Sequence, residues 1–360
     1  MFITIKKWRN GILMVYAFCM HSYALMPNTT ICFSQRDNDT IGQGHSLTKV
    51  SPFKANGELQ LKGTQICNKN GDPIQLRGMS THGLQYRGNC YNDASLGVLV
   101  NNWGVDIIRL SMYVQEGGYA SNPEYWTQYV DTLIEKVSSL GVYILLDWHM
   151  LHPGDPNANR ILAKKFFEHM SKRHAEKTNI IYEICNEPND DNHEVTWALI
   201  KRYAEEIIPV IRKNAPNSLI VVGTPKFCSR PNDVIGNELK YPNILYTAHV
   251  YVGDDDQLQR MENTKEALAA GVPIFVTEWG TQNGWGDGTN DFAKALKWID
   301  FMKENKISWC NWNYSDSPLS GASWKNGTCP DGPWSDENLK ESGKWIKNHI
   351  DTPMDSWARE

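Results

Sequence analysis

The sequence predicts an α/β fold, a (β/α)8 TIM barrel with a short N-terminal β-hairpin that closes the barrel bottom. From Pro73 onward, short apolar segments alternate with longer amphipathic ones, as strands alternate with helices in a parallel barrel. Eight strand–helix units in about 275 residues match the size of such a barrel. A doubly wound open sheet shares this local pattern and is the alternative. It is disfavoured because no glycine-rich phosphate turn follows the first strand and polar clusters end nearly every strand.

The individual elements follow from the apolar pattern. We expect barrel strands at 74–79, 105–110, 142–147, 180–185, 219–223, 244–249, 273–277 and 307–312. Helices are expected near 93–102, 123–140, 157–176, 194–213, 261–270, 290–304 and 336–348. The crossover at 224–242 is rich in Pro and Asn and is expected to be poorly helical. The hairpin is expected from 58–61 and 64–67, around Lys62-Gly63.

The N-terminus has the pattern of a secretory signal peptide. Lys6, Lys7 and Arg9 precede an apolar run at 11–20, and small residues follow up to Ala24. We therefore expect a signal peptide at 1–24 and a secreted, extracellular protein, with an uncleaved anchor as the alternative. The apolar run is too short for a spanning helix.

The remaining chain divides by composition into three parts. Residues 25–55 are polar and without periodicity, and are expected to form a leader or linker. Residues 56–350 are expected to form the barrel domain, and residues 351–360 a C-terminal tail. The net charge is −5, and the sequence has no long run of either sign. The charge therefore gives no reason to expect binding to nucleic acid or to an anionic membrane. Fourteen Trp and fifteen Tyr suit stacking on sugar faces as well as a core.

Signal removal leaves seven of the eight cysteines. Cys185 and Cys310 lie inside apolar strands and are expected to be buried thiols. The other five lie in polar segments, where an oxidising compartment could join some of them, although their connectivity cannot be deduced; they are Cys32, Cys67, Cys90, Cys228 and Cys329. No CxxC spacing is present and the histidines are scattered, so we expect no metal site and no cofactor.

Two glutamates end apolar segments that are predicted to be buried strands. Residues 180–189 (IIYEICNEPN) finish in a polar cluster containing Glu187, and Pro188 prevents extension of the strand. Residues 271–280 (GVPIFVTEWG) carry Glu278 at the equivalent place. The carboxyl ends of parallel barrel strands face one mouth, so these two carboxylates are expected to meet there. Paired carboxylates in a polar cleft are what glycoside hydrolysis requires.

Polar and aromatic residues also follow most of the other expected strands. One such residue is usually a helix cap or a satisfied core group, whereas a set at one barrel mouth predicts a site. In chain order they are His82 and Tyr86, Arg109 and Tyr113, Asp147 and His149, Asn186 and Glu187, His249 and Tyr251, Glu278, and Trp312.

The chain resembles the glycoside hydrolase family 5 cellulases, which are retaining (β/α)8 endoglucanases, from about Glu58 to about Ala322. Asn-Glu-Pro alone is shared by several retaining glycosidase families, but four matching segments in order are highly specific. They are 75–85 (QLRGMSTHGLQ), 147–149 (DWH), 181–189 (IYEICNEPN) and 275–280 (FVTEWG).

The resemblance implies roles for individual residues. Glu187 matches the family's acid/base and Glu278 its nucleophile. Asn186 matches the residue that binds the sugar 2-hydroxyl, and Arg109 the one that keeps the nucleophile ionised. His149, His249 and Tyr251 match residues that orient the sugar and the two carboxylates, and His82 and Trp312 match contacts to the glycone. Tyr86, Tyr113 and Phe227 complete the expected substrate-binding set. These roles agree with elementary electrostatics, because a guanidinium favours an ionised Glu278, and burial beside another carboxylate favours a protonated Glu187.

The chain departs from the family pattern away from the catalytic set. Tyr86 and Phe227 stand where relatives usually carry Trp, and Ser317 and Leu319 stand where many carry Lys and Glu. We therefore expect fewer polar contacts to the distal glycone sugar, which leaves polymer preference open.

Together these observations predict a secreted, monomeric endo-β-1,4-glucanase that acts by double displacement on cellulose or a related β-1,4-linked glucan. Nucleic acid and, after signal removal, membrane are not expected partners. One alternative is the same chemistry on xylan, mannan or xyloglucan. A second is a non-catalytic polysaccharide-binding barrel, which the intact Glu187, Glu278, Asn186 and Arg109 argue against.

Overall fold

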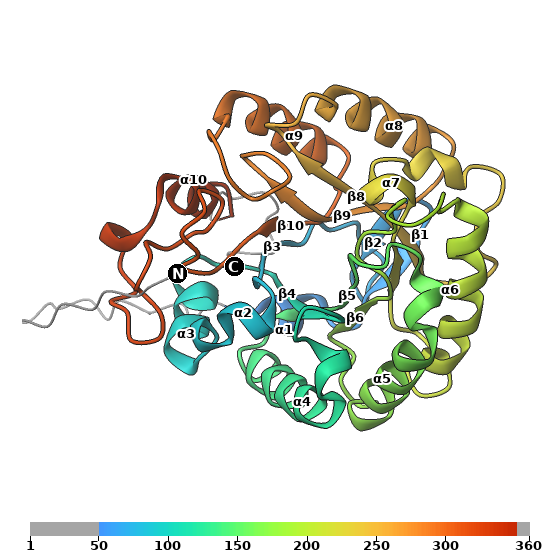
Figure 1. Cartoon of the computed structure of the whole chain (residues 1–360), viewed down its shortest axis with the longest axis horizontal. Helices are drawn as coiled ribbons and strands as arrows, with labels where there is room; N and C mark the ends of the chain where they lie inside the picture. Colours follow the sequence, from blue (N-terminus) through green and yellow to red (C-terminus); the bar gives the residue numbers. More distant parts are fainter. Residues whose placement is uncertain (1–49, 351–360) are drawn as a thin grey trace, which may run out of the picture. The chain divides into compact units, whose positions relative to one another are not determined.

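The computed structural model describes residues 50–350, and these contain a closed barrel of eight strands with helices around it (Figure 1). The strand order is β10-β3-β4-β5-β6-β7-β8-β9, and every neighbouring pair is parallel. This confirms the predicted (β/α)8 barrel. The open doubly wound sheet is excluded because the ring closes through the pairing of β10 with both β3 and β9.

The strands and helices lie close to the ranges that the apolar pattern predicts. The barrel strands are β3 (Arg77–Ser80), β4 (Ile107–Tyr113), β5 (Tyr143–His149), β6 (Ile180–Glu183), β7 (Ile220–Val222), β8 (Ile244–Tyr251), β9 (Ile274–Gly280) and β10 (Trp309–Trp312). The α-helices are α1 (Pro52–Asn56), α2 (Leu84–Arg87), α3 (Asp93–Asn101), α4 (Pro123–Ser139), α5 (Arg160–Arg173), α6 (Trp197–Arg212), α7 (Pro225–Cys228), α8 (Gln257–Ala269), α9 (Phe292–Glu304) and α10 (Glu341–Ile350). Short 3₁₀ helices cover Gly88–Cys90, Tyr119–Ser121, Pro156–Asn159, Pro231–Val234 and Asp336–Asn338.

The expected hairpin is present and lies at the bottom of the barrel. Strands β1 (Gln60–Lys62) and β2 (Gln65–Cys67) pair antiparallel. Ile66 is buried and belongs to the same apolar cluster as Ile107 and Leu145, which point into the lower barrel. The hairpin therefore closes the barrel bottom, as predicted.

The predicted leader or linker at 25–55 overlaps the described residues only at 50–55, and a short helix lies there. Helix α1 begins at Pro52, and the ring of Phe53 meets the ring of Tyr143 edge-on with centroids 5.7 Å apart. A helix of five residues is too short to show a helical period, so only its docking reveals it. Residues 1–49 and 351–360, including the expected signal peptide and C-terminal tail, lie outside the described residues.

The barrel interior changes from apolar at the bottom to polar at the top. Side chains alternate along a strand, so residues two apart share a face. On β5, Leu145 belongs to the lower apolar cluster, whereas Asp147 and His149 on the same face meet each other and polar groups of other strands. The polar residues of the site therefore rest on an apolar floor.

A second apolar cluster fills the space between the barrel and its helices. Several helices begin with a side-chain cap: Asn92 accepts from the Ser95 amide and Asp291 from the Lys294 amide. Such caps contribute about 1 kcal/mol each. The crossover after β7 has a helix of only four residues, α7, in which Lys226 and Phe227 have positive φ angles of 59° and 55°. This confirms the expected poor helicity at 224–242.

The cysteines divide into one pair and four free thiols within the described residues. Cys90 and Cys329 form a disulfide across 239 residues. Cys185 and Cys310 are buried thiols, which confirms the prediction. Cys67 and Cys228, which polar flanking sequence made candidates for pairing, are also buried thiols, and Cys32 lies outside the described range. Among residues 50–350, no helix is both long and apolar enough to span a membrane.

Candidate active site

A cavity of about 460 Å³ opens at the mouth of the barrel, where strands β4, β5, β8, β9 and β10 end. It contains both glutamates that the sequence paired. Its lining residues are His82, Tyr113, His149, Leu151, His152, Glu187, Phe227, Tyr251, Asp254, Arg260, Glu278, Gly284, Trp285 and Trp312.

The two carboxylates are close together. One carboxylate oxygen of Glu187, one of Glu278 and a ring nitrogen of His249 all lie within 4.8 Å of one another. Glu187 follows β6 and Glu278 lies on β9, so barrel closure brings together residues that are distant in the sequence. A pair at this separation can act on the two sides of one sugar carbon.

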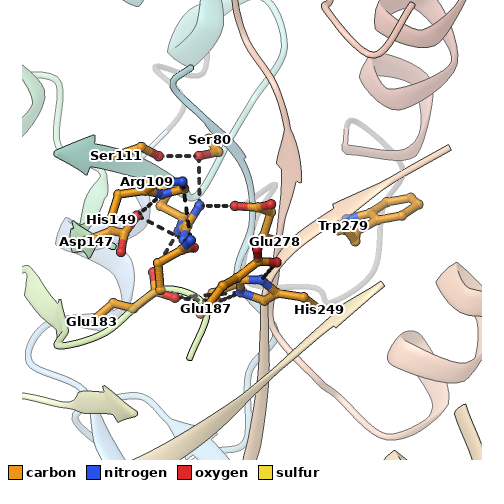
Figure 2. Close-up of polar contacts among 12 residues, drawn as sticks. Ser80, Arg109, Ser111, Asp147, His149, Glu183, Glu187, His249, Glu278 and Trp279 are labelled. Atoms are coloured by element: carbon orange, nitrogen blue, oxygen red, sulfur yellow. Dashed lines mark hydrogen bonds and ion pairs between the residues drawn. The ribbon is translucent and has the colours of Figure 1, made fainter. Parts of the chain in front are cut away.

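Arg109 is the centre of the polar network under this pair (Figure 2). It is fully buried on β4, and its nitrogens reach Glu278 Oε2 at 2.7 Å, Glu183 Oε2 at 2.7 Å, Asp147 Oδ2 at 2.9 Å and Asn186 Oδ1 at 2.6 Å. Although burial alone would lower the pKa of Arg109, the three carboxylates raise it well above its ordinary value. Arg109 therefore stays charged and holds four side chains in fixed positions.

Glu278 is held from two sides. Arg109 donates to one oxygen, and the Tyr251 hydroxyl donates to the other at 2.6 Å. Burial raises the pKa of Glu278 above its ordinary value, while Arg109, His249 and the Tyr251 hydroxyl oppose that rise. The predicted guanidinium contact is thus present, and it offsets only part of the cost of burying this carboxylate.

An irregularity between β8 and β9 lets neighbouring residues Thr277 and Glu278 both face the barrel interior. Thr247 pairs with Phe275, but His249 pairs with Glu278, so β9 carries one extra residue between these pairs. The following residue, Trp279, points away from the carboxylates in Figure 2 and packs between Trp309 and Trp345. The extra residue therefore directs the carboxylate into the site.

Asn186 and His149 form a chain of fixed hydrogen bonds. His149 Nδ1 lies 2.6 Å from Asp147 Oδ2, and its Nε2 lies 3.3 Å from Asn186 Nδ2. Burial, together with the positive charge of Arg109, lowers the pKa of His149 well below its ordinary value. A neutral ring that donates from Nδ1 to Asp147 accepts the Asn186 amide at Nε2, which orients Asn186 beside the cavity.

Glu187 pairs with His249. Its Oε1 lies 2.8 Å from His249 Nδ1, and the other ring nitrogen lies 2.8 Å from Thr277 Oγ1. Burial would lower the pKa of His249, but the nearby Glu183, the hydrogen bond to Glu187 and the other surrounding carboxylates raise it to about 9. The imidazole is thus a proton-carrying partner for Glu187.

Aromatic rings form one wall of the cavity. The Tyr113 ring stacks on His149 with centroids 4.1 Å apart, and the Trp312 ring also stacks on His149, with centroids 5.3 Å apart. His82 contacts the same Trp312 ring at 5.2 Å. These rings present flat faces that suit a pyranose.

The two residues that replace the family's Trp take different places. Phe227 lines the cavity and is exposed to solvent. Tyr86 does not line it, although its ring lies 5.6 Å from Tyr113 and 5.7 Å from His82. Tyr86 lines a neighbouring surface pocket with Tyr125 instead. The structure thus brings together the predicted site residues at the cavity, with Tyr86 beside it.

Ser317 and Leu319, for which the sequence predicts fewer polar contacts to a distal sugar, lie on a loop outside the cavity. Neither side chain lines the cavity, and Ser317 is buried. The ammonium of Lys340 donates to both of their carbonyl oxygens, so the loop is tied toward α10. Neither side chain therefore contacts a sugar that lies inside this cavity.

The site predictions omitted several residues that take part in the network. Glu183 lies inside an expected apolar strand, and a charged residue in a fully buried strand requires a partner, so its sequence position is a signal for a site residue. Thr277 lacked any such signal, because hydroxyls are common in strands. Trp285 also lines the cavity, and its flanking glycines indicated only a loop.

Two groups of side chains within the described residues are spaced to hold a metal ion. One is Glu187, His249 and Glu278, which already hydrogen-bond to one another or to Arg109, Tyr251 and Thr277. The other is Cys90, Cys329 and Asp316, whose two sulfurs are joined in the disulfide.

Residues 67–318 match the family model Cellulase (glycosyl hydrolase family 5). The chain belongs to glycosyl hydrolase family 5. Among relatives of this family 5 chain, endoglucanase E-5 of Thermobifida fusca is 46% identical over 310 residues, which are 83% of this chain and 65% of the relative. Endoglucanase MaCel5A of Microbulbifer sp. is 45% identical over 309 residues, 83% of this chain and 59% of the relative. The family 5 chain thus spans under two thirds of these relatives.

Solved family 5 structures share the fold. The catalytic domain of Thermobifida fusca endoglucanase Cel5A, solved with cellotetraose, has a TM-score of 0.80 and 45% identity, covering 84% of this chain and all of that domain. The cellulase Cel5C_n has a TM-score of 0.81 and 40% identity, covering 88% of this chain and 96% of its own.

Proposed function

We propose that this chain is a secreted endo-β-1,4-glucanase that hydrolyses internal β-1,4-glucosidic bonds with retention of configuration. The observation that carries the proposal is the separation of the Glu187 and Glu278 carboxylate oxygens, within 4.8 Å. Carboxyl groups in retaining glycosidases lie roughly 5–5.5 Å apart, whereas inverting enzymes need roughly 6.5–9.5 Å to seat a water. The endo mode and the glucan substrate rest on relatives named as endoglucanases.

In the first step, a Glu278 oxygen attacks the anomeric carbon while the glycosidic C–O bond breaks, and the leaving oxygen takes the proton of Glu187. Arg109 and Tyr251 direct Glu278 toward that carbon through their hydrogen bonds. In the second step, Glu187 takes a proton from water, the water oxygen bonds to the anomeric carbon, and the bond to Glu278 breaks. Glu278 leaves as the carboxylate and Glu187 regains its proton.

Asn186 is proposed to bind the sugar 2-hydroxyl. Its amide is held by Arg109 at the oxygen and by His149 at the nitrogen. Hydrogen bonds to the 2-hydroxyl strengthen as the oxocarbenium-like transition state forms. His82, Tyr113, Phe227 and Trp312 are proposed as substrate contacts because they line the same cavity, and Tyr86 is proposed as a contact for a sugar beyond it.

Secretion is supported by the Cys90–Cys329 disulfide, since disulfides persist in oxidising compartments. The signal-like N-terminus points the same way. A monomer remains part of the proposal, and light scattering during size-exclusion chromatography would measure it.

The test is release of reducing ends from carboxymethylcellulose, xylan, glucomannan and xyloglucan, with Glu278→Gln as the inactive control. The highest rate is expected on carboxymethylcellulose. A higher rate on another polymer would mean that the same reaction acts on that polymer as the preferred substrate. Binding without turnover on all four would establish the non-catalytic barrel instead.

A further inference from the structure

Thr277 makes three close contacts inside the barrel. It is fully buried on β9, beside Glu278. Its Oγ1 lies 2.7 Å from Glu183 Oε1, 2.8 Å from His249 Nε2 and 2.5 Å from Thr247 Oγ1. One hydroxyl has one proton and two lone pairs, so three partners use all of its capacity.

The direction of each bond follows from the partners. An ionised carboxylate can only accept, so the Thr277 proton goes to Glu183. Glu183 stays ionised because, although burial raises its pKa, Arg109 and His249 lower it below its ordinary value. The Thr277 oxygen then has only lone pairs to offer, and His249 Nε2 must carry the hydrogen that it accepts.

This arrangement fixes what the other side of the His249 ring can do. Nδ1 faces Glu187 Oε1 at 2.8 Å. When Nε2 must keep its hydrogen, removal of the proton between Nδ1 and Glu187 would leave a lone pair facing a carboxylate. That state is unfavourable, so the pair retains its proton, which is the proton that a general acid must donate.

We propose that Thr277 is a positioning residue that holds His249 in the Nε2–H tautomer and thereby keeps a proton available to Glu187. The proposal rests on the function given above. Other charged or titratable groups also face His249 and contribute to its titration: Glu183, whose Oε1 is 3.8 Å from Nε2, and also Glu187, Glu278, His149, and Arg260, which donates to the His249 carbonyl.

The test compares Thr277→Val with Thr277→Ser. Valine removes the acceptor that lies 2.8 Å from Nε2, and Glu183 Oε1, at 3.8 Å, is beyond hydrogen-bond reach. The ring can then carry its hydrogen on Nδ1 and donate to ionised Glu187. The alkaline limb of kcat/KM should therefore move to lower pH, by roughly one pH unit if one hydrogen bond is exchanged. Serine should keep the wild-type limb. Thr264→Val, which removes a buried hydroxyl on α8, is the matched control and should not move it.

An unmoved limb in Thr277→Val, or an equal shift in Thr277→Ser, would overturn the proposal. A second measurement needs no variant: ¹⁵N chemical shifts of wild-type His249 above the alkaline limb should show hydrogen on Nε2, and hydrogen on Nδ1 would refute the relay. If wild type cleaves no glucan, the proposed function fails, while the ¹⁵N result still decides the tautomer.

The exposed side chain of Trp285 is the basis of a second inference, which is independent of Thr277. Its side chain is 88% exposed, the highest value among the exposed large hydrophobic residues of the described range. A single exposed Trp is unremarkable in itself, but this one lines the same cavity as Glu278 and Trp312.

The loop that carries Trp285 is tied down on both sides. The Gly284 amide donates to Asp254 Oδ1 at 3.0 Å, the Trp285 amide to Asn283 Oδ1 at 3.0 Å, and the Gly321 amide to the Gly286 carbonyl at 3.0 Å. Gly286 also lies against the Trp312 indole, since a Cβ there would be 3.7 Å from its Nε1. The backbone that carries the exposed indole is therefore held beside Trp312.

We infer that Trp285 binds the flat face of a sugar unit adjacent to the one that Trp312 contacts. This deepens the proposed function by naming one further polymer contact. Trp285→Ala should raise KM roughly tenfold for cellopentaose, as expected for losing a large stacked ring, and less for the shortest cleavable oligosaccharide, with kcat little changed. Trp285→Phe, which keeps a smaller aromatic ring, should raise KM less than Trp285→Ala does.

The control is Leu258→Ala, which truncates an exposed side chain of α8 outside the cavity and should leave KM unchanged. An equal effect of Trp285→Ala at every chain length, or none, would overturn the inference. Cellopentaose should also quench the fluorescence of wild type more than that of Trp285→Phe. That difference would remain in a barrel that binds but does not cleave, so it separates this contact from the proposed activity.

Discussion

One carboxylate oxygen of Glu187 lies within 4.8 Å of one carboxylate oxygen of Glu278, although Glu187 follows β6 and Glu278 lies on β9. No water fits between the sugar and a carboxylate at that distance, so the product should keep the β configuration. ¹H NMR during hydrolysis of a cello-oligosaccharide should show the β anomer first and the α anomer only after mutarotation. Initial appearance of the α anomer would remove the double-displacement mechanism.

The two glutamates should respond differently to azide. Glu278→Ala should lose turnover, and azide in the space left by the carboxylate should yield an α-glycosyl azide. Glu187→Ala should hydrolyse only activated aryl glycosides, and azide should then yield a β-glycosyl azide. Product configuration by NMR distinguishes them, and reversed configurations would mean that the acid and the nucleophile are exchanged.

Loss of the Tyr251 hydroxyl should move the acid limb of the pH profile. The hydroxyl donates to Glu278 at 2.6 Å and lowers the pKa of this carboxyl. The nucleophile must be ionised, so Tyr251→Phe should raise its pKa and shift the acid limb of kcat/KM to higher pH, by roughly one pH unit for a hydrogen bond to a charged group.

Tyr129→Phe is the matched control for this shift. Its hydroxyl donates to the Gly88 carbonyl outside the cavity, and its removal should leave the acid limb in place. An acid limb that stays fixed or moves to lower pH in Tyr251→Phe would contradict the assigned role of that hydroxyl.

The Cys90–Cys329 disulfide should stabilise the fold without taking part in catalysis. It joins a segment after α2 to one after β10, across 239 residues. Replacing both cysteines by serine should lower the free energy of unfolding by about 2–5 kcal/mol, measured by denaturant unfolding, with little change in kcat at 25 °C. Reductant should lower the Tm of wild type and leave that of the double variant unchanged. Equal Tm values for wild type and variant without reductant would contradict this.

Much of the fold follows from the sequence because barrel strands are buried on both faces and therefore appear as short apolar runs. The same rule places Glu187 and Glu278, since each follows or ends such a run, and parallel strands in a closed barrel end at one mouth. Arg109 and His149 follow from this rule as well. Helix α1 does not, because a single docked turn leaves no periodic signal.

The tertiary structure alone decides which side chains touch across strands. Glu183 and Thr277 become partners through the stagger of the barrel strands and the extra residue in β9. The sequence around the two residues indicates neither the stagger nor the extra residue. The positions of distant loops decide that Cys90 pairs with Cys329. They also decide that Ser317 lies away from the cavity and that Trp285 lines it. The local pattern of apolar and polar residues determines the strands and their ends, because a strand is recognised by the burial of residues that are neighbours in the sequence. Contacts between distant residues depend on barrel geometry, which arises only when all eight strands close.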